Sequence, residues 1–253
     1  MSTTKQLMTG TGGMVTTDSQ EIYEQCCRLR QYGEPGDLSI SSKVYQTEGV
    51  GCNYKLNEMV TALARVKLKH LDDYTAVAQQ LCRQLTERLH PIQGLSGPFV
   101  PPDCTHTYYY FSVQVHPDQL NLDIEPGKLR AAVMQALAAE NVVVSGWQTT
   151  PVAAQLVFQK QNDPQTRCHP WISHGKEVFY DIDEYPNTWA VLDNSFVVWQ
   201  LTQPSTSELV ERYSEAFEKV FTNIDRVVAI YERTTEYIPL VERKNKNRVE
   251  VPI

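Results

Sequence analysis

The sequence predicts a protein of the mixed α/β class, built from a short N-terminal portion, a long connecting helix and a small α+β domain. Apolar residues recur at helical spacing through one long stretch, which indicates a single amphipathic helix. Beyond it, β-branched and aromatic runs alternate with helical patterns, which is typical of an α+β domain. We therefore expect an N-terminal portion at residues 1–56, a connecting helix at 57–90, the α+β domain at 91–234 and a tail at 235–253.

The N-terminal portion contains a glycine-rich turn. Gly10, Gly12 and Gly13 allow backbone angles that bulky residues resist. Asp18 or Ser19 suits the N-cap of a helix that ends before the next glycine. The expected elements are a short strand at 14–17, a helix from 19 to 30 and a long loop at 34–52.

The connecting helix has the strongest helical pattern in the sequence. Asn57 can cap its first turn, and the stretch from Gly94 to Pro102 interrupts regular structure after it. We expect one continuous helix from Asn57 to Leu89. Its apolar stripe comprises Val60, Leu63, Leu71, Ala78, Leu81, Leu85 and Leu89.

The α+β domain begins with a β-branched and aromatic run at 107–115, which predicts a strand. Pro126 suits the start of a helix, and the stretch from Ser205 to Glu208 has the pattern of a capping box that opens another. The remaining expected elements are short strands at 142–144 and 196–199, an irregular region at 146–190 and a last helix that ends near Ile224.

The composition favours a folded, soluble, cytoplasmic protein. Of the 253 residues, 42% are hydrophobic, which is enough for a buried core, and the net charge is −7. Basic residues gather on the connecting helix and in the tail, where solvated surfaces explain them better than a polyanion site. No segment has the length and apolarity of a membrane span, and the first residues lack the apolar core of a signal peptide. We expect no binding to nucleic acid or membranes.

The six cysteines form no CxxC pair and no regular framework, and two of them are adjacent on a predicted helix. This pattern favours reduced thiols over disulfides or a zinc site. The Cys168-His169 pair does not supply the ligand set that zinc needs, so we expect no metal. The cysteines are Cys26, Cys27, Cys52, Cys82, Cys104 and Cys168.

Three motifs follow one another in the first part of the chain. They are Lys5 followed by the glycine turn, the segment Leu29–Gly33 (LRQYG) and the segment Gly51–Glu58 (GCNYKLNE). In this order they resemble the DegT/StrS-type family of pyridoxal-phosphate (PLP) sugar aminotransferases. The resemblance implies that residues 1–56 are a remnant of the large domain of a fold type I PLP-transferase. Taken alone, a lysine so near a terminus is ordinarily a solvated surface charge.

The resemblance implies that Lys5 is the catalytic and cofactor-binding lysine. A lysine amine can form an imine with the aldehyde of pyridoxal 5'-phosphate and can then act as a general base. Asn53 takes the place of an asparagine that reaches the cofactor phosphate of the neighbouring subunit. We therefore expect a homodimer with active sites at its interface. The alternative for Asn53 is an asparagine that only turns the chain before the connecting helix.

The implied reaction moves an amino group from an amino-acid donor, usually glutamate in this family, to a nucleotide-linked keto-sugar. We expect Tyr54, Lys55, His106 and Tyr108 to contact the substrates. Lys55 stands where the family usually has arginine, so it offers a carboxylate a point charge in place of a bidentate contact. If residues 107–115 form a strand, Tyr108 and Tyr110 lie on the same face of it. The alternative to substrate contact is that these side chains pack in the core.

Other positions depart from the family pattern or lie near its expected lid. Thr11 stands where the family usually has a glutamate, and Tyr32 stands where it has a histidine. Both replacements alter the contacts expected with the amino donor and the sugar. Lys5 distinguishes the chain from the dehydratase branch, which has histidine there. The segment 168–171 (CHPW), with Tyr180, Tyr185 and Pro186, is expected to form either a lid or a structural loop.

The resemblance also implies a large domain before Lys5. That domain would supply a phosphate-binding turn, an aromatic ring that stacks on the pyridine and an aspartate that keeps the pyridine nitrogen protonated. We expect the chain to lack these groups. Two functions remain open: an aminotransferase fragment that needs its other half, or a non-catalytic remnant or interaction module.

Overall fold

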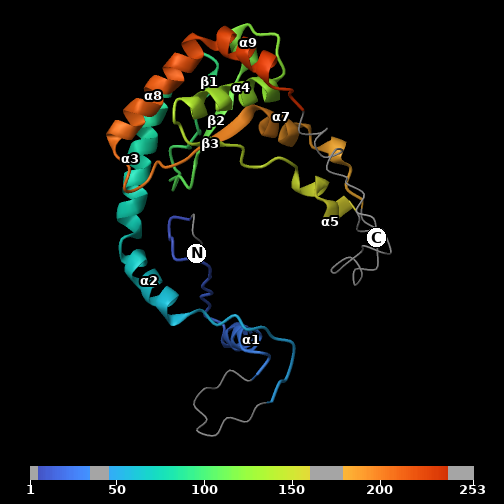
Figure 1. The fold of residues 1–253 in the computed structure, drawn as a ribbon. Coiled ribbons are helices and arrows are strands. Elements are labelled where there is room, and N and C mark those ends of the chain that lie inside the picture. Colours follow the sequence, from blue (N-terminus) through green and yellow to red (C-terminus); the bar gives the residue numbers. More distant parts are fainter. Residues whose placement is uncertain (1–4, 35–45, 160–178, 239–253) are drawn as a thin grey trace. The chain divides into compact units, whose positions relative to one another are not determined.

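The computed structural model describes residues 5–34, 46–159 and 179–238, and the fold is drawn in Figure 1. The chain divides into two compact units, Met1–Thr75 (unit 1) and Ala76–Ile253 (unit 2). Each unit is described by itself. Mixed helices and strands confirm the α/β class predicted from the sequence.

Unit 1 begins with the glycine turn and helix α1 (Gln20–Arg30). The Ser19 hydroxyl accepts a hydrogen bond from the Ile22 N–H, so Ser19 is the N-cap that the sequence predicted. The strand predicted at 14–17 is wrong: these residues belong to no strand, and Met14 is 77% exposed. A strand is stable only when a neighbour pairs with its N–H and C=O groups, and the described part of the chain offers residues 14–17 no such neighbour.

The connecting helix is two helices, α2 (Glu58–Lys69) and α3 (Leu71–Leu89), so the prediction of one continuous helix was wrong. The Asn57 side chain caps α2 as expected, since it accepts the Met59 N–H at 2.9 Å. The interruption is at His70, whose φ of −108° and ψ of 8° lie outside the helical region. Its N–H bonds to the Lys67 carbonyl, which tightens the turn before α3 begins.

The sheet of unit 2 is antiparallel, with the strand order β1-β2-β4-β3. The predicted strand at 107–115 was too long, because Tyr108 has a φ of +50° and cannot continue a strand. Relative to the predicted strands, β3 begins two residues later and ends one later than 142–144, and β4 begins and ends one residue earlier than 196–199. The strands are β1 (Leu95–Ser96), β2 (Phe111–Val115), β3 (Val144–Ser145) and β4 (Ser195–Val198).

The helices of unit 2 follow the sequence prediction in part. Helix α4 begins at Pro126 as expected. The capping box was wrong, because α8 has Thr206 as its N-cap with no side-chain hydrogen bond. The region expected to be irregular contains four short helices in its described residues. The helical elements after α3 are η1 (Pro117–Leu120), α4 (Pro126–Ala139), η2 (Val152–Ala154), α5 (Leu156–Gln159), η3 (Ile182–Glu184), α7 (Pro186–Asn194), α8 (Ser207–Thr222) and α9 (Ile224–Thr234).

One face of the sheet forms the core of unit 2. Val113 is opposite Phe196 and Phe111 is opposite Val198, and residues directly opposite in an antiparallel pair share a face. Leucines of α3, such as Leu85, join the same buried cluster as residues from α4 and α8. The Phe196 ring stacks on Phe217 of α8 with 6.4 Å between ring centroids.

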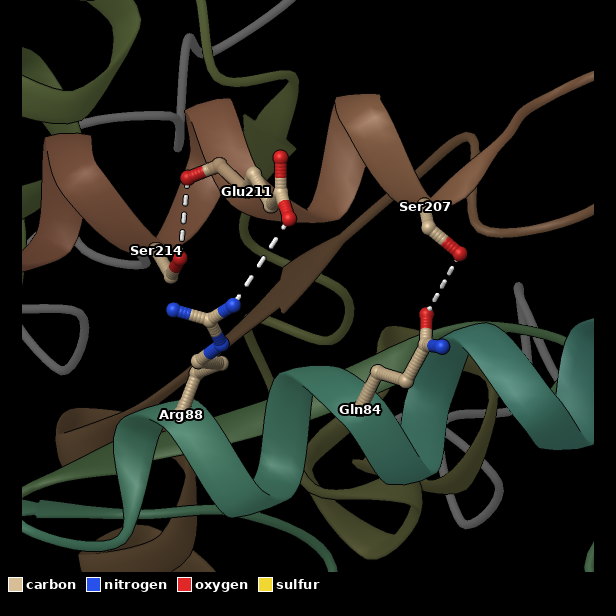
Figure 2. A network of polar contacts seen from close by, with 5 residues as sticks. All are labelled: Gln84, Arg88, Ser207, Glu211 and Ser214. Carbon is tan, nitrogen blue, oxygen red and sulfur yellow. Dashed lines mark hydrogen bonds and ion pairs between the residues drawn. The ribbon is translucent and has the colours of Figure 1, made fainter.

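Polar contacts join the exposed sides of α3 and α8 (Figure 2). The Ser207 hydroxyl donates to the Gln84 side-chain oxygen at 2.9 Å, and Arg88 forms an ion pair with Glu211 at 3.7 Å. Ser214 donates to the Glu211 carbonyl at 2.8 Å. The first two contacts link α3 to α8, and the third lies within α8.

The two units differ in how much apolar surface they bury. Among the described residues, the buried hydrophobic side chains of unit 1 are Cys27 and Ala64, and all others belong to unit 2. On α2, apolar side chains such as Met59 and Val66 are exposed. Unit 2 therefore has its own hydrophobic core, and the described residues of unit 1 form none. Separately, none of the helices in the described ranges is long and apolar enough to cross a membrane.

Candidate functional site

Lys5 precedes the glycine turn and has an exposed side chain. Four residues later, Thr9 is buried, and its hydroxyl has no hydrogen-bond partner in the part of the chain that the structure describes. Gly10 adopts a φ of +94°, a conformation that favours glycine and explains the turn. A buried hydroxyl without a partner is costly to leave unpaired, so it marks the turn as a place where a polar group could bind.

The end of α1 is joined to the segment 48–54 by main-chain hydrogen bonds. The Tyr32 N–H donates to the Cys52 carbonyl at 3.1 Å, and the Cys52 N–H donates to the Leu29 carbonyl at 2.8 Å. The Tyr54 N–H donates to the Arg30 carbonyl at 3.0 Å. The motif at 29–33 and the motif at 51–58 therefore form one local structure.

Asn53, Tyr54 and Lys55 are all exposed on this local structure. The main chain of Asn53 bridges to Gln31, and its side-chain amide makes no hydrogen bond within the described residues. The Lys55 ammonium lies over the Tyr32 ring, 5.1 Å from its centroid. A side-chain hydrogen bond with Cys52, and then the charge of that thiol and burial, raise the pKa of Tyr54.

His106 and Tyr108 belong to unit 2 and are half-buried. The Tyr108 N–H donates to Nδ1 of His106 at 2.8 Å, and their rings lie 4.3 Å apart between centroids. Burial, and then the nearby Cys82, raise the pKa of the Tyr108 phenol. Tyr108 and Tyr110 do not share a strand face as predicted, because β2 begins only at Phe111.

The structure brings some predicted site residues together and not others. Asn53, Tyr54 and Lys55 share one segment of unit 1, whereas His106 and Tyr108 form a separate pair in unit 2. No hydrogen bond between Lys5 and Asn53 is present in the described ranges. The CHPW segment at 168–171 lies outside the described residues. Of its predicted companions, Tyr180 contacts Phe158, with 5.7 Å between ring centroids.

The sequence interpretation missed several residues near these positions. Gln79 of α3 donates from its side chain to the His106 carbonyl at 3.0 Å. A glutamine on an amphipathic helix gives no signal of such a role. A cluster of four aromatic rings was also missed, although the run of tyrosines before β2 pointed to part of it. The cluster comprises Tyr109, Tyr110, Trp147 and Trp199, with centroid distances between 4.9 and 6.0 Å.

The order of these motifs and the fold around them define the class of protein. Residues 2–173 match the DegT/DnrJ/EryC1/StrS aminotransferase family. This match covers more than half of the chain, and the chain belongs to that family. It confirms the resemblance predicted from Lys5, the glycine turn and the Asn53 motif.

Curated relatives include proteins of amino-sugar and polysaccharide biosynthesis. The chain is 28% identical over 163 residues to the spore coat polysaccharide biosynthesis protein SpsC of Bacillus subtilis (strain 168), covering 62% of this chain and 40% of SpsC. It is 31% identical over 105 residues to the dTDP-3-amino-3,4,6-trideoxy-alpha-D-glucose transaminase of Streptomyces venezuelae, covering 42% of this chain and 26% of that enzyme. The chain thus matches less than half the length of either relative.

Solved structures with the same fold are sugar aminotransferases and related enzymes. The aminotransferase TlmJ from Streptoalloteichus hindustanus matches with a TM-score of 0.64 and 16% identity, over 87% of this chain and 50% of TlmJ. The putative sugar aminotransferase Spr1654 from Streptococcus pneumoniae, solved in a PMP form, matches with a TM-score of 0.62 and 13% identity, over 84% of this chain and 48% of that protein. These likenesses establish the fold.

Proposed function

We propose that this chain carries the lysine-bearing part of a PLP-dependent aminotransferase that acts on nucleotide-linked keto-sugars. The observation that supports this most directly is the family match over residues 2–173, which includes Lys5, the glycine turn and the Asn53 motif. Relatives named as dTDP-amino-sugar transaminases and as a UDP-N-acetyl-3-dehydro-alpha-D-glucosamine 3-aminotransferase support the substrate class.

The residues around the glycine turn fit pyridoxal phosphate in their chemistry. Lys5 offers a primary amine for covalent attachment, and the buried Thr9 hydroxyl lacks a partner in the described chain. Asn53 offers an exposed amide with no hydrogen bond in the same ranges, which suits a phosphate oxygen. When bound, the cofactor supplies the electron sink for the amino transfer.

Each predicted residue then has a role in the proposed reaction. Lys5 would hold the cofactor and, once the amine of the donor displaces it, would act as the general base for the proton transfer. Asn53 reaches the cofactor phosphate of a second subunit in a homodimer. Lys55, held over the Tyr32 ring, offers a point charge to the carboxylate of glutamate as donor. His106 and Tyr108 contact the nucleotide-linked sugar.

The proposed activity needs further residues that correspond to the rest of the relatives' length. The apolar side chains that unit 1 exposes support this, because a protein surface rarely leaves so many large hydrophobic groups in water. They include Met14, Val15, Ile22, Tyr23, Leu29, Val50, Met59, Leu63, Val66 and Leu68. We expect the complementary part of the large domain, in the same or another chain, to cover them.

Borohydride reduction in the presence of pyridoxal phosphate tests the role of Lys5. We expect a stable pyridoxyl adduct on Lys5, located by peptide mass spectrometry, and an absorption band of the bound cofactor before reduction. Lys5→Arg keeps the positive charge and should abolish both signals. Lys55→Arg is the matched control and should keep them. Absence of an adduct at Lys5, or an equal yield in Lys5→Arg, would count against the proposal.

The alternative is a non-catalytic remnant or interaction module. The observation that favours it is the hydrophobic core of unit 2, whose buried cluster consists of residues of that unit. The same reduction experiment distinguishes the two functions, because a non-catalytic module requires no reactive amine at Lys5.

A further inference from the structure

The hydrogen bond between the Tyr108 N–H and Nδ1 of His106 determines where the imidazole carries its proton. A ring nitrogen that accepts an N–H bond at 2.8 Å has no proton of its own. A neutral imidazole carries one proton, which must then be on Nε2. His106 therefore presents an N–H donor on the side of the ring away from the Tyr108 main chain.

The backbone at Tyr108, which donates this bond, is strained. Its φ of +50° is a left-handed conformation that a bulky aromatic residue rarely adopts. The N–H of this same residue donates to the His106 ring, two residues earlier in the chain. Strain of this kind persists where the surrounding structure holds it, and it often marks a functional position.

Gln79 holds the main chain of His106. Its side-chain N–H donates to the His106 carbonyl at 3.0 Å across 27 positions of sequence. Gln79 stands on α3 between Ala78 and the buried pair Leu81 and Cys82, so its own main chain is fixed by the core. This hydrogen bond thus connects the main chain at His106 to helix α3.

We propose that Gln79 is a positioning residue that keeps His106 in the tautomer protonated at Nε2, as a preset hydrogen-bond donor to an oxygen of the sugar nucleotide. This inference rests on the proposed function for the identity of the ligand. The Tyr108 ring lies beside the His106 ring and packs partly against the core of unit 2. An imidazole N–H donor suits an oxygen of such a ligand.

Nitrogen NMR of the full chain labelled in its histidines tests the tautomer. The spectrum of His106→Gln identifies the His106 signals among those of the six histidines. In the unaltered chain we expect an unprotonated-type Nδ1 and a protonated-type Nε2. Gln79→Glu keeps the side-chain shape but removes the donor, so the His106 signals should broaden or average between the two tautomers.

Gln84→Glu is the matched control. Gln84 is on the same helix, but its side-chain oxygen accepts from Ser207 (Figure 2), and a carboxylate can accept the same bond. This variant should leave the His106 signals unchanged. A proton on Nδ1 in the unaltered chain, or the same His106 signals in Gln79→Glu as in the unaltered chain, would overturn the proposal.

Titration with dTDP-glucose tests the ligand. We expect the Nε2 signal of His106 to shift on binding, with roughly tenfold weaker affinity in Gln79→Glu and unchanged affinity in Gln84→Glu. Binding that shifts other signals but not that of His106 would overturn the donor role while leaving the proposed function intact. No binding at all would overturn the donor role in this chain, whereas the tautomer is decided by the ligand-free spectra and the proposed function by the reduction experiment at Lys5.

Discussion

Gly51 lies so close to Gly33 that a Cβ on Gly51 would stand 1.9 Å from the Gly33 nitrogen. Gly33 has its own requirement for glycine, because its φ is +75° and a Cβ would meet the Gly49 carbonyl oxygen at 1.8 Å. Two motifs that are separate in the sequence therefore meet through backbone contact that side chains would prevent. This contact places Asn53 and Lys55 at the end of α1.

Gly51→Ala should separate these two segments. The added methyl group meets main-chain atoms, which cannot rotate away as a side chain can, so we expect a local cost of about 1–3 kcal/mol. Hydrogen exchange at the Tyr32, Cys52 and Tyr54 amides should accelerate accordingly. Gly13→Ala, where a Cβ meets nothing within 4 Å, is the control and should leave these rates unchanged. Equal protection in both variants would contradict the close contact.

Tyr32→Leu should release Lys55 from the aromatic ring. An exposed cation–π contact contributes about 0.5–1 kcal/mol, so the main effect is on side-chain order and not on folding. In NMR spectra the Lys55 side-chain protons should lose the ring-induced shift in Tyr32→Leu and keep it in Tyr32→Phe. Lys67, which lies 5.3 Å from the Tyr74 ring centroid, is an internal reference and should not change in either variant. Identical Lys55 shifts in the Leu and Phe variants would exclude the contact.

Asp193 should make stability depend on pH. Burial, and then the neighbouring Glu125, raise its pKa above the ordinary value of 3.8, and Arg130 opposes them. A raised pKa in the folded state favours the neutral acid. Its contribution to stability is therefore complete below pH 3.8 and is lost as the pH rises through the folded-state pKa.

Asp193→Asn tests this sign, because the amide stays neutral at every pH. The variant should be more stable than the unaltered chain at pH 7, and the difference should narrow as the pH falls through the folded-state pKa and be smallest below 3.8. Urea denaturation at several pH values measures it. The same substitution at Asp118, which is exposed, is the control and should not reproduce the trend. If the stability difference between Asp193→Asn and the unaltered chain grows as the pH falls, folding lowers the pKa of Asp193 and the prediction is wrong.

Leu85→Ala and Arg88→Gln should separate the two kinds of contact between α3 and its neighbours. Leu85 is fully buried, so truncation should lower the free energy of unfolding by about 2–5 kcal/mol. Arg88 and Glu211 have side chains that are 57% and 59% exposed, so loss of that ion pair should cost about 1 kcal/mol or less. Urea unfolding measures both. A larger loss in Arg88→Gln would show that the polar contacts of Figure 2 dominate.

Local signals in the sequence predicted much of the fold. Asn57 was identified as an N-cap, and Ser19 as one of two candidates, because a polar side chain followed by an amphipathic pattern is a short-range signal. Pro126 marked the start of α4 in the same way. The interruption at His70 and the absence of a strand at 14–17 were missed. Both depend on what the main chain contacts elsewhere, which hydrophobic periodicity does not encode.

The candidate site was predicted residue by residue but not in its contacts. Tyr32 and Lys55 were each recognised as departures from the family pattern, and only the structure shows that one lies over the other. The hydrogen bond from the Gln79 side chain to the His106 carbonyl joins residues 27 positions apart. Because its acceptor is a main-chain group, no pattern of residue types could reveal it. The left-handed backbone at Tyr108 was equally invisible, because a run of tyrosines predicts a strand.

The unequal burial of apolar groups in the two units decides what a melting experiment on this chain can detect. Heat capacity change and denaturant sensitivity both scale with the surface exposed on unfolding, and nearly all of that surface is in unit 2. A calorimetric transition will therefore report the scaffold that carries His106. The segments that carry Lys5 and Asn53 can loosen with little heat absorbed, and only a probe placed on those residues will register the change.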